Sequence, residues 1–315
     1  MALRMGSWIL LLAVSAWAGA PEPPDGVAGL PFTIRANRVF VDVSLNGAAH
    51  CEALLDTGSE VTLANRARVT IPELRILGTQ QLNGAFVGDL GAQRALLTSL
   101  KLGSHEYRDV PLGVIKHGPG QALEQIACLL GMDLLGRSRF TLEFAYGRLL
   151  VWPAGMRLPP PAPEIERAAL PMHRAPHELQ QRPRAFVTIN GRQRLSFLFD
   201  TGAETLLLAA MKPHEELGLS AGGALRGFAQ VNDGSVSRRV EIRETVFKDV
   251  QFGTLKFEQA DGRVLEAAEV RSPLAREDLA GLYNIVGLGF MKSLHAVHVD
   301  VPGRMLYLER RRATP

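Results

Sequence analysis

The chain of 315 residues has only two cysteines, few aromatic residues and little clustering of charge of one sign. Neither the spacing nor the surroundings of Cys51 and Cys128 are typical of a metal site or a cysteine nucleophile. The net charge is only +3, and basic residues gather only at Arg310–Arg312, so we predict no nucleic-acid partner. No segment reaches the roughly 20 apolar residues that a membrane-spanning helix needs.

Residues 1–20 have the pattern of a secretory signal peptide. Arg4 precedes the apolar stretch 8–14, and the small residues around Ala16 and Ala18 form a cleavage signal. The alternative is an uncleaved membrane anchor, which the short apolar run disfavours. We expect an exported protein, periplasmic or secreted, without stable membrane insertion after signal cleavage. Such a compartment permits a disulfide between Cys51 and Cys128; two buried free thiols are the alternative.

The composition predicts a mostly β protein. Hydrophobic residues make up 46% and charged residues 21%, and 31 glycines and 19 prolines indicate many turns between short strands. The length allows one large or two medium domains, each with its own core.

The sequence contains the same unit twice. An apolar run leads into Asp56-Thr57-Gly58, and a second apolar run leads into Asp200-Thr201-Gly202. Each run is typical of a buried strand that ends in a tight loop. An apolar strand with a glycine and a closing hairpin also recur, which makes gene duplication the simplest explanation.

A Pro-rich segment separates the two copies and defines the expected domains. Proline at this density blocks helix and sheet, so we expect a linker at 153–183, whose end could join the second unit as a first strand. The predicted lobes are 30–152 and 184–309.

Asp56 and Asp200 are the candidate catalytic residues. Peptide hydrolysis by two carboxylates requires them to lie a few ångströms apart around one water, one as general base and one as proton donor. One aspartate at the same place in each copy allows a pseudo-two-fold axis to bring them together. The glycine permits the tight turn, and the threonine hydroxyl can reach the opposite loop.

On these motifs the chain resembles the retropepsin-like aspartic proteases, in a tandem, single-chain bacterial form. The family pattern is an apolar pair before Asp-Thr-Gly-Ser/Ala, a flap hairpin, and a later apolar-apolar-Gly strand beneath the active-site loop. The matching segments are Leu54–Ser59 with Leu129-Leu130-Gly131 and Leu198–Ala203 with Ile285-Val286-Gly287.

The resemblance implies two closed β-barrel lobes with the active site between them. It also implies loop support from Thr57, Gly58, Ser59, Thr201, Gly202, Ala203, Gly131 and Gly287, and flap candidates at Gly84, Ala85, Phe86, Gly227 and Phe228.

The chain departs from the retroviral pattern at two places in each copy. Glu60 and Glu204 stand where retroviral enzymes usually have Asp, and Met132 and Leu288 stand where they usually have Arg. This departure removes an expected ion pair. The copies also differ from each other: Ser59 could donate a hydrogen bond to Asp56, whereas Ala203 cannot do so for Asp200. We therefore hypothesise that Asp56 is the more ionised member of the pair.

The sequence predicts a monomeric aspartic endopeptidase that cleaves extended polypeptides with water and needs no cofactor or metal. One alternative is a non-catalytic, exported peptide-binding protein that kept the cleft. Another is an enzyme in which each domain dimerises with a second chain.

Overall fold

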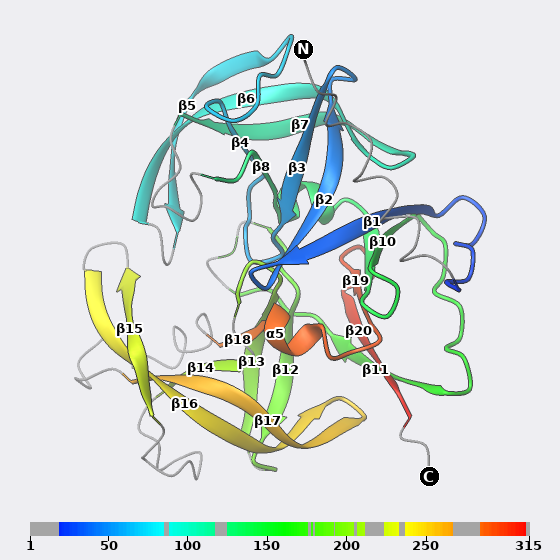
Figure 1. Cartoon of the computed structure of the whole chain (residues 1–315), viewed down its shortest axis with the longest axis vertical. Coiled ribbons are helices and arrows are strands. Elements are labelled where there is room, and N and C mark those ends of the chain that lie inside the picture. Colours follow the sequence, from blue (N-terminus) through cyan, green and yellow to red (C-terminus); the bar gives the residue numbers. More distant parts are fainter. Residues whose placement is uncertain are drawn as a thin grey trace, which may run out of the picture.

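The computed structural model describes residues 19–84, 88–116, 125–175, 178, 180–191, 193–204, 207–211, 224–232, 237–266 and 284–312. Within these residues the protein is built almost entirely of β-strands, arranged in two sheets, with two short helices (Figure 1). The prediction of a mostly β fold is therefore confirmed.

Within its described residues the first half contains ten strands and one helix of a single turn. They are β1 (Ala28–Arg35), β2 (Arg38–Leu45), β3 (Ala49–Leu55), β4 (Leu63–Asn65), β5 (Arg75–Gly84), β6 (Gly88–Leu102), β7 (His105–Ile115), β8 (Cys128–Leu130), α3 (Met132–Leu135), β9 (Arg139–Glu143) and β10 (Arg148–Trp152).

The second half repeats this composition within its described residues. Its elements are β11 (Ile165–Pro171), β12 (Arg184–Ile189), β13 (Gln193–Asp200), β14 (Leu207–Met211), β15 (Leu225–Asn232), β16 (Ser237–Phe252), β17 (Leu255–Glu266), β18 (Ile285–Gly287), α5 (Leu288–Met291), β19 (Ala296–Asp300) and β20 (Met305–Arg311).

The first hairpin shows how local sequence produces these strands. In β2 the side chains of Val39, Val41 and Val43 are buried while Asp42 is exposed, the alternation expected of a strand with one face on the core. The following Asn46 and Gly47 have φ values of 49° and 70°. Asparagine and glycine tolerate this region best, so the turn forms where the sequence predicts it.

The strand order is the same in the two halves. Seven neighbouring strands of the larger sheet follow the order β2-β3-β8-β4-β7-β6-β5, and the smaller sheet follows β12-β13-β18-β14-β17-β16-β15. In both, the strand that leads to an aspartate lies parallel to the short strand that ends beneath it. The short strands β8 and β18 are buried throughout, so each aspartate loop lies on a strand within the core.

A third group of strands joins the halves. The larger sheet continues as β11-β20-β19-β9-β10-β1, and β9 of the first half pairs directly with β19 of the second. The two halves also share one hydrophobic core, which contains residues of both. In Figure 1 strands β2 to β8 of the larger sheet and the smaller sheet occupy opposite ends of the molecule, and β1, β10, β19 and β20 of the larger sheet lie on the right between them.

A strand lies within the range that the sequence predicts to be a linker. β11 pairs with β20 over its whole length, from Ile165 opposite Arg311 to Pro171 opposite Met305. Ile165, Ala168 and Leu170 are buried, so the segment has enough alternating apolar residues to add an edge strand despite its prolines.

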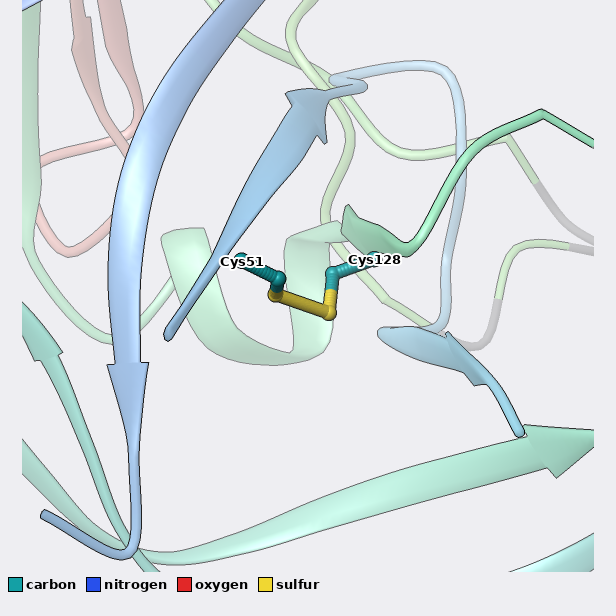
Figure 2. Close-up of a disulfide and its surroundings, with 2 residues drawn as sticks. All are labelled: Cys51 and Cys128. Atoms are coloured by element: carbon teal, nitrogen blue, oxygen red, sulfur yellow. A yellow bond between two sulfur atoms is a disulfide. The ribbon is translucent and has the colours of Figure 1, made fainter. Parts of the chain in front are cut away.

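The two cysteines form a disulfide between β3 and β8 (Figure 2). Their Cα atoms are 6.6 Å apart because the two strands are parallel neighbours, with Ala53 opposite Cys128. The disulfide, which the sequence leaves open against two free thiols, thus joins the strand before Asp56 to the strand before Gly131.

We expect the Cys51→Ala/Cys128→Ala double variant to unfold more easily than the wild type. The bond closes a loop across 77 residues, and its removal restores chain entropy to the unfolded state worth about 4 kcal/mol. Urea unfolding of both proteins measures this difference. The wild type in reductant is the matched control, and equal midpoints for the oxidised wild type and the double variant would contradict the expectation.

No helix among the described residues is long and apolar enough to cross a membrane. The predicted signal peptide lies mostly outside these residues.

Candidate active site

Asp56 and Asp200 occupy matching places at the ends of strands. Asp56 follows the last residue of β3, and its backbone N–H donates to the carbonyl oxygen of Leu130 at 3.0 Å. Asp200 is the last residue of β13 and lies opposite Gly287 of β18. Each carboxylate is therefore held at the edge of a buried parallel pair of strands, where the chain turns.

The two threonines lock the loops together. The Thr57 hydroxyl donates to the carbonyl oxygen of Phe199 at 2.6 Å and accepts the backbone N–H of Thr201 at 3.0 Å. The Thr201 hydroxyl donates to the carbonyl oxygen of Leu55 at 2.6 Å and accepts the N–H of Thr57 at 3.0 Å. Both threonines are 1% exposed, so all four bonds are shielded from water. In this structure the two loops meet within one chain.

The loop glycines allow the carboxyl groups to approach. A Cβ on Gly202 would lie 2.6 to 2.7 Å from the carboxyl atoms of Asp56, and a Cβ on Gly58 would overlap the carboxyl of Asp200. Each glycine also donates its N–H to the aspartate of its own loop, at 2.9 Å to Asp56 Oδ1 and 2.8 Å to Asp200 Oδ1. A side chain at either glycine would push the two carboxyl groups apart.

Burial and the repulsion between two neighbouring carboxylates keep one proton on the aspartate pair. Burial, followed by the charge of Asp200 and a hydrogen bond to it, raises the pKa of Asp56 to about 8. Burial also raises the pKa of Asp200, but the hydrogen bond from the Gly202 N–H, the hydrogen bond to Asp56 and the positive charge of Arg182 oppose that increase. The pair therefore holds one proton through neutral pH, and the positive charge of Arg182 favours Asp200 as its ionised member.

The hypothesis that Ser59 makes Asp56 the more ionised carboxylate is wrong. The Ser59 hydroxyl turns away and donates to the carbonyl oxygen of Val61 at 2.9 Å. Ser59 gives Asp56 only its backbone N–H, at 3.1 Å. The Ser59 hydroxyl therefore makes a bond within its own loop that Ala203 cannot make. A difference in charge between the two aspartates must come from other groups.

Glu60 and Glu204 keep ion pairs, each with an arginine from the opposite half of the chain. Arg38 Nη2 lies 2.8 Å from Glu204 Oε1, and Arg182 Nε lies 3.7 Å from Glu60 Oε1. Neither arginine is among the site residues that the motifs predict. A signal is nevertheless present in the sequence, because each stands 18 residues before its own aspartate, at the same offset of the repeat.

Gly131 and Gly287 lie beneath the loops as expected. A Cβ on Gly131 would overlap the backbone of Val61. The residues after the two glycines complete the support: Met132 N–H donates to Ser59 O, and Leu288 N–H to Ala203 O, both at 2.9 Å. Met132 and Leu288 therefore hold the loops through their backbones, where retroviral enzymes carry an arginine.

The flap candidates fall on two hairpins. β5 and β6 pair up to Gly84 opposite Gly88, so Gly84 is at the end of a hairpin arm; Ala85 and Phe86 lie outside the described residues. In the second half β15 and β16 pair up to Asn232 opposite Ser237. Gly227 and Phe228 are therefore in the arm of that hairpin and away from its turn. Both hairpins extend to the same side of the molecule, on the left of Figure 1.

Comparison with known proteins agrees with this architecture. The aspartic proteinase from Irpex lacteus matches with a TM-score of 0.57 and 14% sequence identity, over 91% of this chain and 98% of that chain. At this identity the likeness shows the fold alone: the chain has the fold of an aspartic proteinase. No curated protein matches the sequence.

A protein-family model also matches part of the amino-acid sequence. The model described as aspartyl protease matches residues 41–134, the stretch that holds Asp56-Thr57-Gly58 and Gly131. The resemblance to the retropepsin-like aspartic proteases that the motifs predict is thereby confirmed. The match supports a peptidase.

Proposed function

We propose that this protein is an aspartic endopeptidase that hydrolyses extended polypeptides with the pair Asp56 and Asp200. The observation that carries the proposal is the meeting of the two Asp-Thr-Gly loops, locked by reciprocal threonine bonds, with one carboxyl protonated and the other ionised. The family match over residues 41–134 supports the same chemistry.

The two carboxyl groups divide the reaction between them. Asp200, ionised, takes a proton from a water held between the aspartates, and the oxygen of that water attacks the scissile carbonyl carbon. Asp56 donates its proton to the carbonyl oxygen, which gives a neutral tetrahedral intermediate. Asp200 then passes its proton to the amide nitrogen while Asp56 takes a proton from a hydroxyl of the intermediate. The C–N bond breaks, and a carboxylic acid and an amine leave with the two aspartates in their starting states. No covalent bond to the protein forms.

We propose further that one chain forms the complete site as a pseudo-symmetric pair of lobes. The identical order of seven strands in the two halves, the β9–β19 pairing and the cross-half ion pairs support a monomer. The β5–β6 and β15–β16 hairpins, which extend to one side, are the proposed flaps over an extended substrate. The signal pattern of residues 1–20 and the disulfide support export to an oxidising compartment.

The test is cleavage of a peptide library by the mature wild-type protein from pH 3 to pH 9, with and without a pepstatin-type inhibitor. We expect cleavage inside extended peptides, blocked by the inhibitor, from a protein that elutes as a monomer. Binding of peptides without cleavage at any pH would favour a non-catalytic binding protein instead. Activity that appears only with dimer formation would contradict the single-chain site.

A further inference from the structure

We propose that Arg182, held by the buried Glu178, is a positioning residue that keeps Asp200 as the ionised aspartate and so gives the two aspartates unequal roles. This inference rests on the proposed function, since it assigns the general base of that reaction. Arg182 lies in the segment before β12, within the range that the sequence predicts to be a linker.

Arg182 reaches the catalytic loop of the opposite half. Its Nη1 donates to the carbonyl oxygen of Gly58 at 3.0 Å. Gly58 is the residue whose α-carbon faces the carboxyl of Asp200. The Arg182 guanidinium therefore bonds the same residue that the Asp200 carboxyl contacts. A positive charge at this place favours the ionised form of that carboxyl. Burial raises the pKa of Asp200, and this charge opposes the rise.

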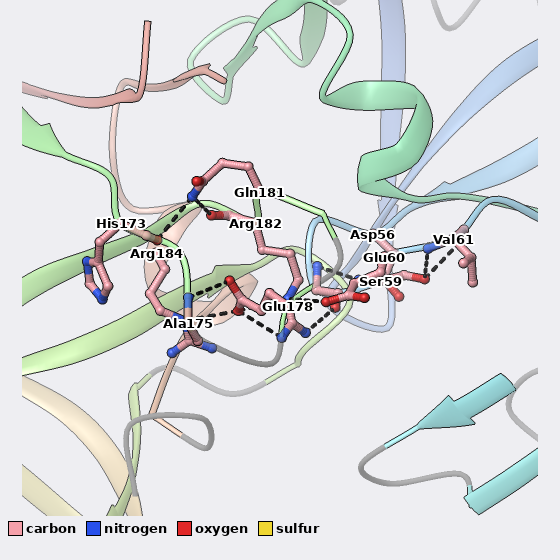
Figure 3. Close-up of polar contacts among 11 residues, drawn as sticks. Asp56, Ser59, Glu60, Val61, His173, Ala175, Glu178, Gln181, Arg182 and Arg184 are labelled. Carbon is pink, nitrogen blue, oxygen red and sulfur yellow. Dashed lines mark hydrogen bonds and ion pairs between the residues drawn. The ribbon is translucent and has the colours of Figure 1, made fainter. Parts of the chain in front are cut away.

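Glu178 fixes Arg182 in this place. Its Oε1 accepts from Arg182 Nε at 3.0 Å and from Arg184 Nε at 3.1 Å, and its Oε2 accepts the backbone N–H of Ala175 at 3.0 Å. The side chains of Glu178 and Arg184 are 1% exposed and that of Arg182 is 19% exposed. Figure 3 shows Glu178 between Arg184 and the Arg182 side chain, which points toward Glu60. A buried, charge-assisted network of this kind is rigid and little screened by salt.

The matching arginine of the first half is placed differently. Arg38 pairs with Glu204, whose side chain is 50% exposed. Among the described residues Arg38 has no hydrogen bond to Gly202, the counterpart of Gly58, and no buried acid holds it. The two arginines thus occupy the same place in the repeat, but only Arg182 is fixed against the carbonyl of a catalytic loop.

Other charged groups also lie around the two loops. Glu60 and Glu204 stand at matching positions, and each lies beside an arginine of the opposite half, Glu60 at 3.7 Å from Arg182 and Glu204 at 2.8 Å from Arg38. Asp133 of α3 accepts the Thr62 hydroxyl at 2.6 Å on the first-half side, and Lys292 beyond α5 donates to Asn37. Among the described residues, Glu178, Arg182 and Arg184 form a buried network on one side of the pair.

The experiment compares the pH dependence of kcat/KM in the wild type, Arg182→Gln and Arg38→Gln. Removal of the charge of Arg182 raises the pKa of Asp200, so the acidic limb of the profile moves up by roughly one pH unit. The limb at higher pH, which reports loss of the Asp56 proton, moves less. Arg38→Gln is the matched control and should leave the acidic limb in place, and Arg182→Lys should restore much of the wild-type profile.

A second readout separates this inference from the proposed function. Carboxyl ¹³C NMR of aspartate-labelled protein, assigned with Asp56→Asn and Asp200→Asn, follows the titration of the pair without substrate. A wild type that cleaves nothing would refute the proposed function, yet the pair would still titrate and show whether Arg182 biases it. If Arg182→Gln does not fold, Arg182→Met removes the same charge at similar side-chain length. An unchanged lower pKa without the Arg182 charge, or an equal shift in Arg38→Gln, would overturn the inference.

Discussion

Asp200→Asn is expected to lower kcat by about 10⁴-fold, because an amide cannot accept the proton of the attacking water. Asp56→Asn should cost a comparable factor, since it removes the proton that the scissile carbonyl oxygen receives. Both variants should remain folded, because asparagine has nearly the shape of aspartate and the substitution relieves the repulsion between two neighbouring carboxyl groups. Single-turnover cleavage of the best library peptide measures both variants.

The same roles of the two aspartates predict how the activity of the wild type depends on pH. Burial and the Asp200 charge raise the pKa of Asp56 to about 8, so its proton stays in the site through neutral pH. Activity should persist to neutral pH and fall as pH rises through that value, because the proton donor is then lost. On the acidic side activity falls when Asp200 also gains a proton. A profile confined to strongly acidic pH would contradict this assignment.

Asp42→Asn is the control for both variants. Asp42 is exposed on β2, away from the two loops, and its substitution also replaces a carboxylate by an amide. It should cleave at the wild-type rate. Cleavage that survives in Asp56→Asn or Asp200→Asn at the rate of Asp42→Asn would reject the dyad.

Gly58→Ala is expected to reduce kcat/KM by about 100-fold or more while leaving the protein folded. The new Cβ would overlap the carboxyl of Asp200, and that side chain must move. A displacement of about 1 Å at a reacting group is enough for a loss of this size. Peptide cleavage and thermal unfolding together measure the change.

Gly155→Ala is the control for this substitution. Gly155 is an exposed glycine in the turn after β10, outside both hairpins, and a Cβ at this position would have no neighbour within 4 Å. Its φ of 79° makes alanine less stable there by about 1 kcal/mol, but the variant should be fully active. A Gly58→Ala protein as active as Gly155→Ala would show that the carboxyl groups do not approach as closely as the structure has them.

Much of the fold could be predicted because its signals are local. The alternation of Val39, Val41 and Val43, and the Asn46-Gly47 turn, need no information from elsewhere in the chain. The repeat of Asp-Thr-Gly identifies both aspartates, since the same local pattern at two places implies the same local structure. The predicted strands that lead into Asp56 and Asp200 lie where the sequence places them.

The differences from the sequence-based expectations concern contacts that exist only in the folded chain. Ser59 is next to Asp56 in the loop, but its hydroxyl has a closer acceptor in Val61 O. The residues after Gly131 and Gly287 suggest the loss of an ion pair, whereas Glu60 and Glu204 find their partners in the opposite half of the chain. Gly227 is the residue type expected in a flap turn, although the strand pairing continues beyond it.

The sequence by itself therefore determined the two aspartate loops, their apolar strands and the repeat that relates them, because periodicity and turn residues act over a few positions. Only the tertiary structure decided which aspartate holds the proton. That choice depends on the charge of Arg182, brought to Gly58 by the buried Glu178 across 124 residues of chain. Electrostatic effects depend on distance in space and on burial, and neither is visible before the chain folds.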